Sequence, residues 1–227
     1  ESGKHEIVST SCTHASDALD IAGISNADVA IDFTSPETVM NNIRALSKLR
    51  VPLVVGTTGW YEHLDEVKKL VEASGTGLVY GQNFSIGANI FFQIVAFSSR
   101  LFGTFGGYDV LAHEIHHAGK KDSPSGTARK LADIILENFP AKTILQSDTL
   151  NRRVQGDELH FSSVRGGHNR GMHEIIFDSA ADEITLRHQA HGRRGFAEGA
   201  LVAAEFIKDK KGVHSFDELF SSNETMV

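Results

Sequence analysis

The segment from His113 to Ala128, HEIHHAGKKDSPSGTA, concentrates side chains that move protons or bind anions. Its first five residues, His113 to His117, fit H-E-x-x-H, which on a helix directs two imidazoles at one zinc ion. The preceding residues, 108–112, alternate weakly and favour a strand, on which four residues span roughly 13 Å. Because that span is too long for one tetrahedral zinc, we expect no metal here. A zinc hydrolase is the alternative that the motif leaves open.

The second half of the segment has the features of an anion site. Ser125-Gly126-Thr127 opens a helix whose first backbone N–H groups lack partners within the helix and whose dipole favours an anion. The glycine allows close approach to the backbone, and the threonine hydroxyl adds a donor. Lys120 and Lys121 supply a cation and a proton nearby. His116 or His117 titrates near neutrality, which suits proton exchange with a reacting ring.

Strand and helix patterns alternate in the first third of the chain. The expected elements are strands at 28–33, 51–55 and 77–80 and helices at 35–49 and 62–73. Ser35 suits the N-cap of the first helix and Pro36 its first position. The run Glu6–Thr10 has the pattern of a strand and follows a glycine, so we expect a further strand and helix before Glu1. This order predicts a parallel sheet with its ligand crevice at the carboxyl ends of the strands.

Two loops of this sheet lie where doubly wound sheets bind ligands. Gly56-Thr57-Thr58-Gly59 follows one strand, and Gly81-Gln82-Asn83-Phe84 follows the next. Both offer backbone donors and small polar groups, as a nicotinamide carboxamide or ribose needs. An ordinary tight turn is the alternative for the first loop. No G-x-G-x-x-G fingerprint stands at a position that fits.

From Ser85 onward the pattern indicates a second domain. The expected elements are helices at 86–102, 125–138 and 196–208 and strands at 108–116, 143–146, 159–164, 173–177 and 183–188. Short strands with turn-rich joints indicate a mixed sheet. The loop 165–173 is either an anion-binding loop or a long hairpin with a basic tip. We interpret Arg193-Arg194 as a solvated joint, and a short tail follows the last helix.

Composition restricts the partners. With a net charge of −7, the chain is not expected to bind nucleic acid electrostatically. No apolar run approaches the roughly 20 residues that span a bilayer, so we expect no membrane partner. Cys12 is the only cysteine, which excludes a disulfide within the chain. Together with the lack of a recognisable signal peptide, this predicts a cytoplasmic protein.

These motifs together resemble the 4-hydroxy-tetrahydrodipicolinate reductase (dihydrodipicolinate reductase) family of bacterial lysine and diaminopimelate synthesis. The resemblance covers nearly the whole chain and rests on Asp32-Phe-Thr34-x-Pro36, Gly56-Thr-Thr-Gly59, Asn83-Phe-Ser85-x-Gly87, His116-His117-x-x-Lys120-x-Asp122-x-Pro124-Ser-Gly-Thr127 and Phe196-Ala-x-Gly199-Ala. It implies a Rossmann-like α/β dinucleotide-binding domain at 1–84 plus 195–227, whose first strand and glycine-rich loop we expect before Glu1. It also implies an α+β domain with a mixed sheet at 85–194, which binds substrate and builds a homotetramer.

The resemblance further implies the role of each site residue. His116 donates or accepts a proton, and Lys120 donates one. His117, Gly126 and Thr127 bind the carboxylates of a small dicarboxylate substrate. The residues implied to hold the nicotinamide end of NADH or NADPH are Gly56, Thr57, Thr58, Gly81, Gln82, Asn83 and Phe84. Hydride attacks C4 of the bound ring as a proton is delivered, and water is lost in the net reaction.

Two alternatives remain open within this resemblance. Ser9-Thr-Ser-Cys-Thr-His14 stands where the family places an acidic residue that binds the adenosine ribose. NADPH is therefore expected to be accepted as readily as NADH, although no arginine marks a 2′-phosphate site. The chain is expected to be an enzyme. The alternative is a catalytically silent relative that binds a dinucleotide or a metabolite without turnover.

Overall fold

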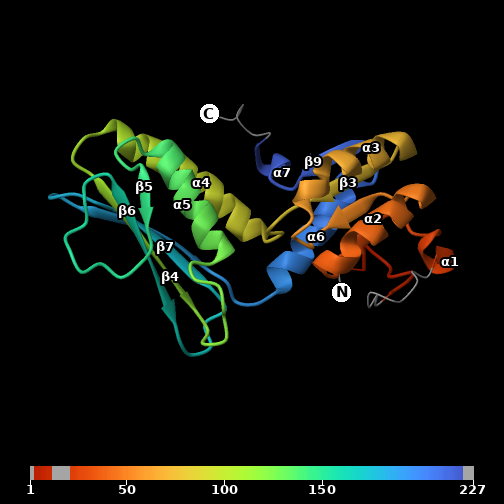
Figure 1. Cartoon of the computed structure of the whole chain (residues 1–227), viewed down its shortest axis with the longest axis horizontal. Helices are drawn as coiled ribbons and strands as arrows, with labels where there is room; N and C mark the ends of the chain where they lie inside the picture. The colour runs from red at the N-terminus through yellow and green to blue at the C-terminus, as the bar shows by residue number, and fades with distance from the viewer. Residues whose placement is uncertain (1–2, 12–20, 222–227) are drawn as a thin grey trace. The chain divides into compact units, whose positions relative to one another are not determined.

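The computed structural model describes residues 3–11 and 21–221, whose path is shown in Figure 1. The chain divides into two compact units. The first combines the residues up to Ile86 with those from Gly195 onward, and the second runs from Gly87 to Arg194. The sequence features at Glu1, Cys12 and His14 lie outside the described residues.

The first unit contains a parallel sheet with strand order β1-β2-β3-β9. Its strands are β1 (Ala30–Asp32), β2 (Leu53–Val55), β3 (Gly77–Tyr80) and β9 (Gly212–Ser215). Its helices are α1 (Ile21–Ile24), α2 (Pro36–Leu49), α3 (Leu64–Ser74), α6 (Arg194–Ile207) and α7 (Glu218–Ser221), with a 3-10 turn at Tyr61–His63. The alternating order expected from the sequence is confirmed. The tail expected after α6 is wrong, because it contains β9 and α7.

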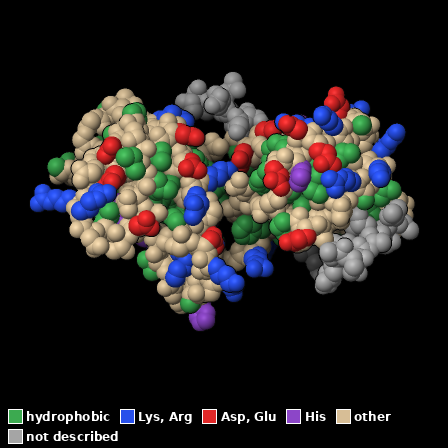
Figure 2. All heavy atoms as spheres, viewed as in Figure 1, with side chains coloured by type: hydrophobic (Ala, Val, Ile, Leu, Met, Phe, Trp, Pro, Cys, Tyr) green, Lys and Arg blue, Asp and Glu red, His purple; other side chains and the backbone are tan. Residues whose placement is uncertain are grey.

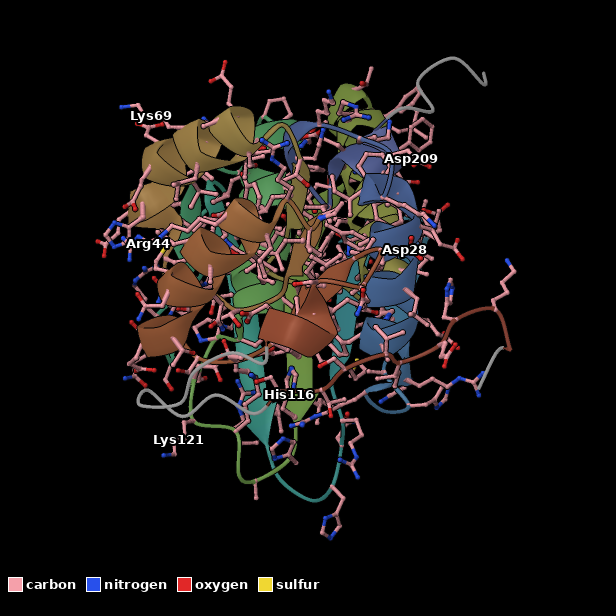
Figure 3. The ribbon with its side chains drawn as sticks, turned by 90° about the vertical axis from the view of Figure 1, so that its right-hand side faces the viewer. Asp28, Arg44, Lys69, His116, Lys121 and Asp209 are labelled. Atoms are coloured by element: carbon pink, nitrogen blue, oxygen red, sulfur yellow. The ribbon has the colours of Figure 1, made fainter. Side chains whose placement is uncertain are left out.

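Helices cover both faces of this sheet. Leu53 and Val55 pack with α2 and α3 in one core, whereas Val54, between them, packs with α6 in another. Successive side chains of a strand point to opposite faces, so an unbroken apolar strand requires cover on both sides. Figure 3 shows α2 and α3 (brown) on one side of the strands and α6 (blue) on the other. This is the layered arrangement of a Rossmann-like domain.

Two features of the N-terminal part test the sequence patterns directly. Ser35 is the N-cap of α2 and Pro36 lies in its first turn, which confirms the expected helix start. The expected strand Glu6–Thr10 is wrong, because these residues belong to no strand and Ile7 is 82 % exposed. Alternating apolar side chains make a strand only where a neighbouring strand supplies backbone hydrogen bonds.

Gly199 of α6 allows that helix to approach the backbone of Phe84 closely. A Cβ atom at position 199 would overlap the carbonyl oxygen of Phe84, and the ring of Phe216 would lie 3.4 Å from it. Since a backbone carbonyl cannot move aside cheaply, we expect Gly199→Ala to destabilise the protein by about 1–3 kcal/mol or more. Gly195→Ala in the same helix is the control, since its Cβ atom would lie 3.4 Å from Ser85 Oγ. Urea unfolding of both variants measures the difference, and equal stabilities would contradict the close approach.

The second unit is a mixed sheet with helices on one face. Its strands are β4 (Asp109–His116), β5 (Ile144–Gln146), β6 (Glu158–Arg165), β7 (Met172–Asp178) and β8 (Glu183–Gln189), in the order β5-β6-β4-β7-β8. The β5–β6 and β6–β4 pairs are parallel, and the β4–β7 and β7–β8 pairs are antiparallel. Its helices α4 (Ile86–Thr104) and α5 (Gly126–Asn138) pack with the sheet in one core. The expected α+β domain with a mixed sheet is thereby confirmed.

The connection between β6 and β7 is not a hairpin. Both strands pair with β4, which lies between them, and they do not pair with each other. The hairpin interpretation of residues 165–173 is therefore wrong. Instead the loop hydrogen-bonds the end of β4, where His117 N–H donates to Asn169 O at 2.8 Å and Gly166 N–H donates to His116 O at 3.0 Å. These bonds fix the backbone on which the histidine pair stands.

Helix α4 is long and apolar enough, by length and composition alone, to cross a membrane. One of its faces contributes Ala88, Phe91, Phe92 and Val95 to the core of the second unit. Core helices of globular proteins have the same length and composition. On the molecular face drawn in Figure 2, acidic and basic side chains are interspersed over both units.

Candidate active site

The H-E-x-x-H motif lies on strand β4, which confirms the expected strand context. Side chains alternate along β4, so that Glu114 and His116 are buried on the face covered by helices. His113 lies on the opposite face, where its Nε2 is 3.7 Å from Glu174 Oε1. The two histidines of the motif, His113 and His117, are four residues apart, and on a strand that separation spans roughly 13 Å, too far for both imidazoles to reach one tetrahedral zinc ion.

Glu114 is completely buried and takes three hydrogen bonds on one oxygen. Ser125 N–H, Ser163 Oγ and Arg165 Nη2 donate to its Oε1 at 2.9, 2.8 and 2.7 Å. Burial alone would raise the pKa of this carboxyl. Hydrogen bonds from His173, Ser125 and Arg165 outweigh burial and hold its pKa well below the ordinary value. Glu114 is therefore ionised and ties together β4, β6 and the start of α5.

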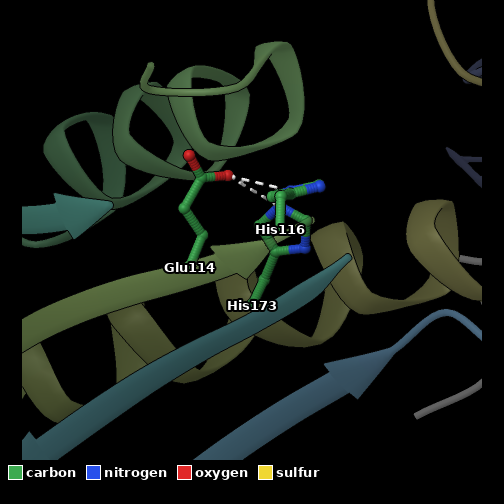
Figure 4. Close-up of side chains that lie close together, drawn as sticks. All are labelled: Glu114, His116 and His173. Atoms are coloured by element: carbon green, nitrogen blue, oxygen red, sulfur yellow. Dashed lines mark hydrogen bonds and ion pairs between the residues drawn. The ribbon is translucent and has the colours of Figure 1, made fainter. Parts of the chain in front are cut away.

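The second oxygen of Glu114 faces two imidazoles (Figure 4). Oε2 lies 3.1 Å from His116 Nε2 and 3.3 Å from His173 Nε2, and the two nitrogens lie 3.5 Å apart. Ser125 Oγ is 3.3 Å from the same His173 nitrogen. Side chains from two strands and from a helix N-cap thus converge in the interior of the second unit.

This trio has the donor set of a small cation site. Its three ligand atoms lie within 4.8 Å of one another. However, the guanidinium of Arg165 already balances the charge of the Glu114 carboxylate at 2.7 Å. A divalent ion would add two further positive charges to this buried cluster, next to the charge of Arg165. The expectation that no metal binds stays a prediction, which elemental analysis of the purified protein can test.

The pKa of His116 lies below the neutral range, so His116 does not meet the expectation that one histidine of the pair titrates near neutrality. Burial disfavours the imidazolium and lowers the pKa of His116 to about 4, although the charge of Glu114 acts in the opposite direction. Burial, with a contribution from His173, also lowers the pKa of His188 in strand β8. His116 is therefore neutral at neutral pH and acts through one protonated and one bare ring nitrogen.

The lowered pKa of His116 predicts a loss of stability in acid. An unfolded histidine binds a proton near pH 6.5, whereas folded His116 binds one only near pH 4. As pH falls between these values the unfolded chain gains a proton that the folded chain lacks, so the free energy of unfolding falls by on the order of 3 kcal/mol. Urea unfolding at several pH values should show that the free energy of unfolding depends less steeply on pH in His116→Gln than in the wild type. Equal slopes would contradict the buried, neutral histidine.

The loop after β4 holds Lys120 beside Asp122. Lys120 Nζ lies 2.8 Å from Asp122 Oδ1, and this hydrogen bond is the main cause of the lowered pKa of Asp122. A further cause is a hydrogen bond from the backbone of Gly126 at the start of α5. Arg165 Nη2 also donates to the carbonyl of Asp122 at 2.8 Å. Figure 3 shows Lys121 on the loop beyond His116, with its side chain directed outward.

The start of α5, where the sequence predicts an anion site, already makes several hydrogen bonds within the protein. Ser125 is its N-cap and accepts a bond from Ala128 N–H at 3.1 Å, while Ser125 N–H donates to Glu114. Two of the first N–H groups therefore have acceptors outside the helical hydrogen-bond ladder, in Glu114 and in the N-cap side chain. Gly126 is exposed, with no atom within 4 Å of where a Cβ atom would lie. This position leaves room for a ligand next to the ion pair of Lys120.

In the first unit, the loops after β1, β2 and β3 lie side by side. The parallel register pairs Asp32 with Val55 and Val55 with Tyr80, so Phe33, Gly56 and Gly81 follow at one edge of the sheet. The buried carboxylate of Asp32 accepts hydrogen bonds that join two of these loops and α2. The donors are Thr34 N–H, Thr34 Oγ1, Thr57 Oγ1 and Asn42 Nδ2.

These loops fit the nicotinamide end of a dinucleotide through their backbone. A Cβ atom at Gly56 would overlap the ring of Phe33, which is 51 % exposed beside it. The side chains of Thr57 and Phe84 are buried, so any contact they make with a ligand involves their backbone. Exposed Thr58 and Gln82 add polar side chains. The edge thus combines backbone amides and carbonyls with an accessible aromatic ring, which suits a flat amide-bearing ligand.

Three residues of the candidate site in the second unit were not assigned a role from the sequence. Glu114 seemed unused once the zinc motif was rejected, His173 was only part of a strand, and Arg165 was part of an ambiguous loop. Glu114 and His116 have the same parity along β4 as buried Val110 and Ala112. A period of two therefore predicts a buried carboxylate, and buried carboxylates need partners.

Comparisons with known proteins agree with both units. Residues 3–84 match the family model described as dihydrodipicolinate reductase, N-terminus, and residues 87–220 match its C-terminus model. The 4-hydroxy-tetrahydrodipicolinate reductase of Christiangramia forsetii is 38 % identical over 197 residues, covering 86 % of this chain and 80 % of that one. The protein of the same name from Methanocaldococcus jannaschii is 34 % identical over 201 residues, covering 87 % and 72 %.

A solved structure has the same architecture. Dihydrodipicolinate reductase from Paenisporosarcina sp. TG-14, with dipicolinate bound, matches with a TM-score of 0.69 and 26 % sequence identity. The match covers 85 % of this chain and 73 % of that one. The two family models together span most of this chain, and the relatives exceed 30 % identity over most of their length. The chain therefore belongs to the dihydrodipicolinate reductase family of oxidoreductases.

Proposed function

We propose that this chain reduces 4-hydroxy-tetrahydrodipicolinate to tetrahydrodipicolinate in the synthesis of diaminopimelate and lysine. The observation that supports this most strongly is the segment from His116 to Thr127. It combines a cationic, proton-bearing Lys120 with the exposed start of α5 at Gly126. Such a pairing suits a small dicarboxylate that is protonated as it is reduced.

In this proposal the substrate domain at residues 85–194, which contains the second unit, binds the substrate. Gly126 N–H, Thr127 and His117 hold its carboxylates, and a carboxylate arriving at Gly126 replaces the contact that Asp122 makes there. Lys120 donates the proton that accompanies reduction. Neutral His116 takes part through a ring nitrogen as a hydrogen-bond and proton partner rather than as an imidazolium.

The dinucleotide-binding domain proposed at residues 1–84 with 195–227 holds the cofactor, which is a pyridine nucleotide. When bound, the reduced nicotinamide supplies the hydride that is added at C4 of the ring. We propose that the loops Gly56–Thr58 and Gly81–Phe84 fix its carboxamide through their backbone, and that Phe33 shields it from water. NADH and NADPH are both expected to serve, because no charged group selecting the 2′ position was identified from the sequence.

Turnover with freshly prepared 4-hydroxy-tetrahydrodipicolinate tests this proposal, with NADH and NADPH assayed in parallel. We expect oxidation of the nicotinamide and formation of tetrahydrodipicolinate in equal amounts. Tight binding of dipicolinate without turnover by either nucleotide would instead favour the catalytically silent relative.

We further propose a cytoplasmic homotetramer assembled through the second unit. The face of its sheet opposite α4 and α5 carries Leu111 and Val164, which are 41 % and 49 % exposed. Apolar side chains on an uncovered sheet face favour association with another copy of the chain. Leu111→Glu should reduce the mass measured by sedimentation, whereas Glu137→Gln on α5 should not. A tetramer that persists in Leu111→Glu would contradict this choice of face.

A further inference from the structure

The buried contacts of Glu114 determine more than the stability of the second unit. Its Oε1 accepts three hydrogen bonds, from Ser125, Ser163 and Arg165. This oxygen has no capacity left for the imidazoles, so Oε2 is the atom that faces His116 and His173. An ionised carboxylate can only accept hydrogen bonds. A neutral imidazole facing it is therefore stabilised with its proton on the nearer nitrogen, Nε2.

The burial of His173 determines which of its own ring nitrogens carries the proton. Its Nδ1 is buried and has no hydrogen-bond partner among the residues that the structure describes. A proton on that nitrogen would leave a buried N–H without an acceptor, which is costly, whereas a bare nitrogen loses less. The proton of His173 therefore belongs on Nε2, which lies 3.3 Å from Glu114 Oε2.

Gly171 packs beside the other edge of the His116 ring, where a Cβ atom would come within 2.9 Å of His116 Cε1 and 3.4 Å of Nδ1. Gly171 has a φ of +133°, which favours glycine, so no side chain from position 171 closes off this edge. With the proton on Nε2, His116 presents a bare Nδ1 there. The charged groups that face His116 come from three places: Glu114 on its own strand, Arg165 on β6, and Lys120 on the loop.

We propose that Glu114 is a positioning residue of this reductase, which holds His116 in the Nε2–H tautomer and leaves Nδ1 as a hydrogen-bond acceptor toward the substrate. The inference rests on the proposed function, because it assigns the acceptor to the substrate site. It also gives Glu114 a role in orienting His116, in addition to the stability that its hydrogen bonds with Ser125, Ser163 and Arg165 provide. In serine proteases, replacing the aspartate that orients the catalytic histidine leaves the geometry of the site intact, but the histidine then carries its proton on the wrong nitrogen.

Glu114→Gln is the variant that separates orientation from structure. The three donors on Oε1 force the amide oxygen of the glutamine into the same place, so its NH₂ group faces His116 and His173. Nε2 of His116 must then accept, and the proton moves to Nδ1. We expect kcat to fall about 10²-fold or more, by analogy with the tautomer effect above, while KM for the substrate stays within about 3-fold because Lys120 and Gly126 are unchanged.

Nitrogen NMR of the histidine side chains reports the tautomer directly, in the protein without substrate. We expect the Nε2–H form for His116 in the wild type and the Nδ1–H form in Glu114→Gln. Glu174→Gln is the matched control, since Glu174 lies beside His113 on the opposite face of the sheet. This control should keep the wild-type tautomer and the wild-type kcat.

Three results would overturn the proposal. The first is an Nδ1–H tautomer of His116 in the wild type, which can be measured even if Glu114→Gln fails to fold. The second is unchanged kcat in a folded Glu114→Gln protein. The third is one divalent ion per wild-type chain that is lost in Glu114→Gln, because a metal requires bare nitrogens facing Glu114. Failure of the wild type to turn over the substrate would count against the proposed function, and the tautomer would still be decided by NMR.

Discussion

Replacing Lys120 by alanine is expected to lower kcat for the reductase reaction by about 10²- to 10⁴-fold, the usual contribution of a positioned proton donor. Lys120 is the cationic side chain that the structure places against Asp122 at the start of α5, at an N–O distance of 2.8 Å. Steady-state turnover over a range of pH measures the loss.

Lys121→Ala is the matched control for this variant. Lys121 has the same side chain, the next position in the sequence and an exposed, outward orientation. It should retain wild-type kcat. If the two variants lose activity equally, the charge of the loop matters and the position of Lys120 does not. Full activity in Lys120→Ala would remove this residue from the proposed mechanism.

Replacing Arg165 by methionine is expected to destabilise the protein by about 3–5 kcal/mol, because it leaves the buried charge of Glu114 without its counter-ion. Arg165 Nη2 lies 2.7 Å from Glu114 Oε1, and Glu114 is completely buried. The same substitution also removes the bond from Arg165 to the carbonyl of Asp122. We therefore expect weaker binding of dipicolinate in addition to a lower free energy of unfolding.

Arg170→Met is the control, since Arg170 is an exposed arginine of the same connection between β6 and β7. Its effect on stability should stay within about 0.5 kcal/mol, as for most surface substitutions. Chemical denaturation of the two variants gives the comparison. Similar stabilities would mean that the Glu114–Arg165 pair is not the structural link between β4, β6 and the loop.

The order of elements could be predicted from the sequence because local signals agreed with the final packing. Ser35-Pro36 marked a helix start, and the apolar run at 51–55 marked a strand buried on both faces. Strand β9 was missed because its pairing with β3 joins residues far apart in the sequence. Residues 6–10 were wrongly expected to form a strand, since alternation describes side chains and says nothing about a backbone partner.

The site could be predicted only in part, for a related reason. The segment from His116 to Thr127 is contiguous, so its residue types and spacing are visible in the sequence. The partners of Glu114 come from β6, β7 and α5, and only the sheet order brings them together. Burial then changed the expected chemistry, because it lowers the pKa of His116 and keeps that histidine neutral. Pairing across strands cannot be read from spacing alone.

The transfer of an isotopic label tests the central claim most directly. Wild-type protein is supplied with reduced nicotinamide nucleotide that carries deuterium at its hydride position, together with fresh 4-hydroxy-tetrahydrodipicolinate. The account predicts one deuterium at C4 of the tetrahydrodipicolinate formed and oxidised nucleotide in equal amount. Product without deuterium, or no product from a folded protein that binds both compounds, would contradict it.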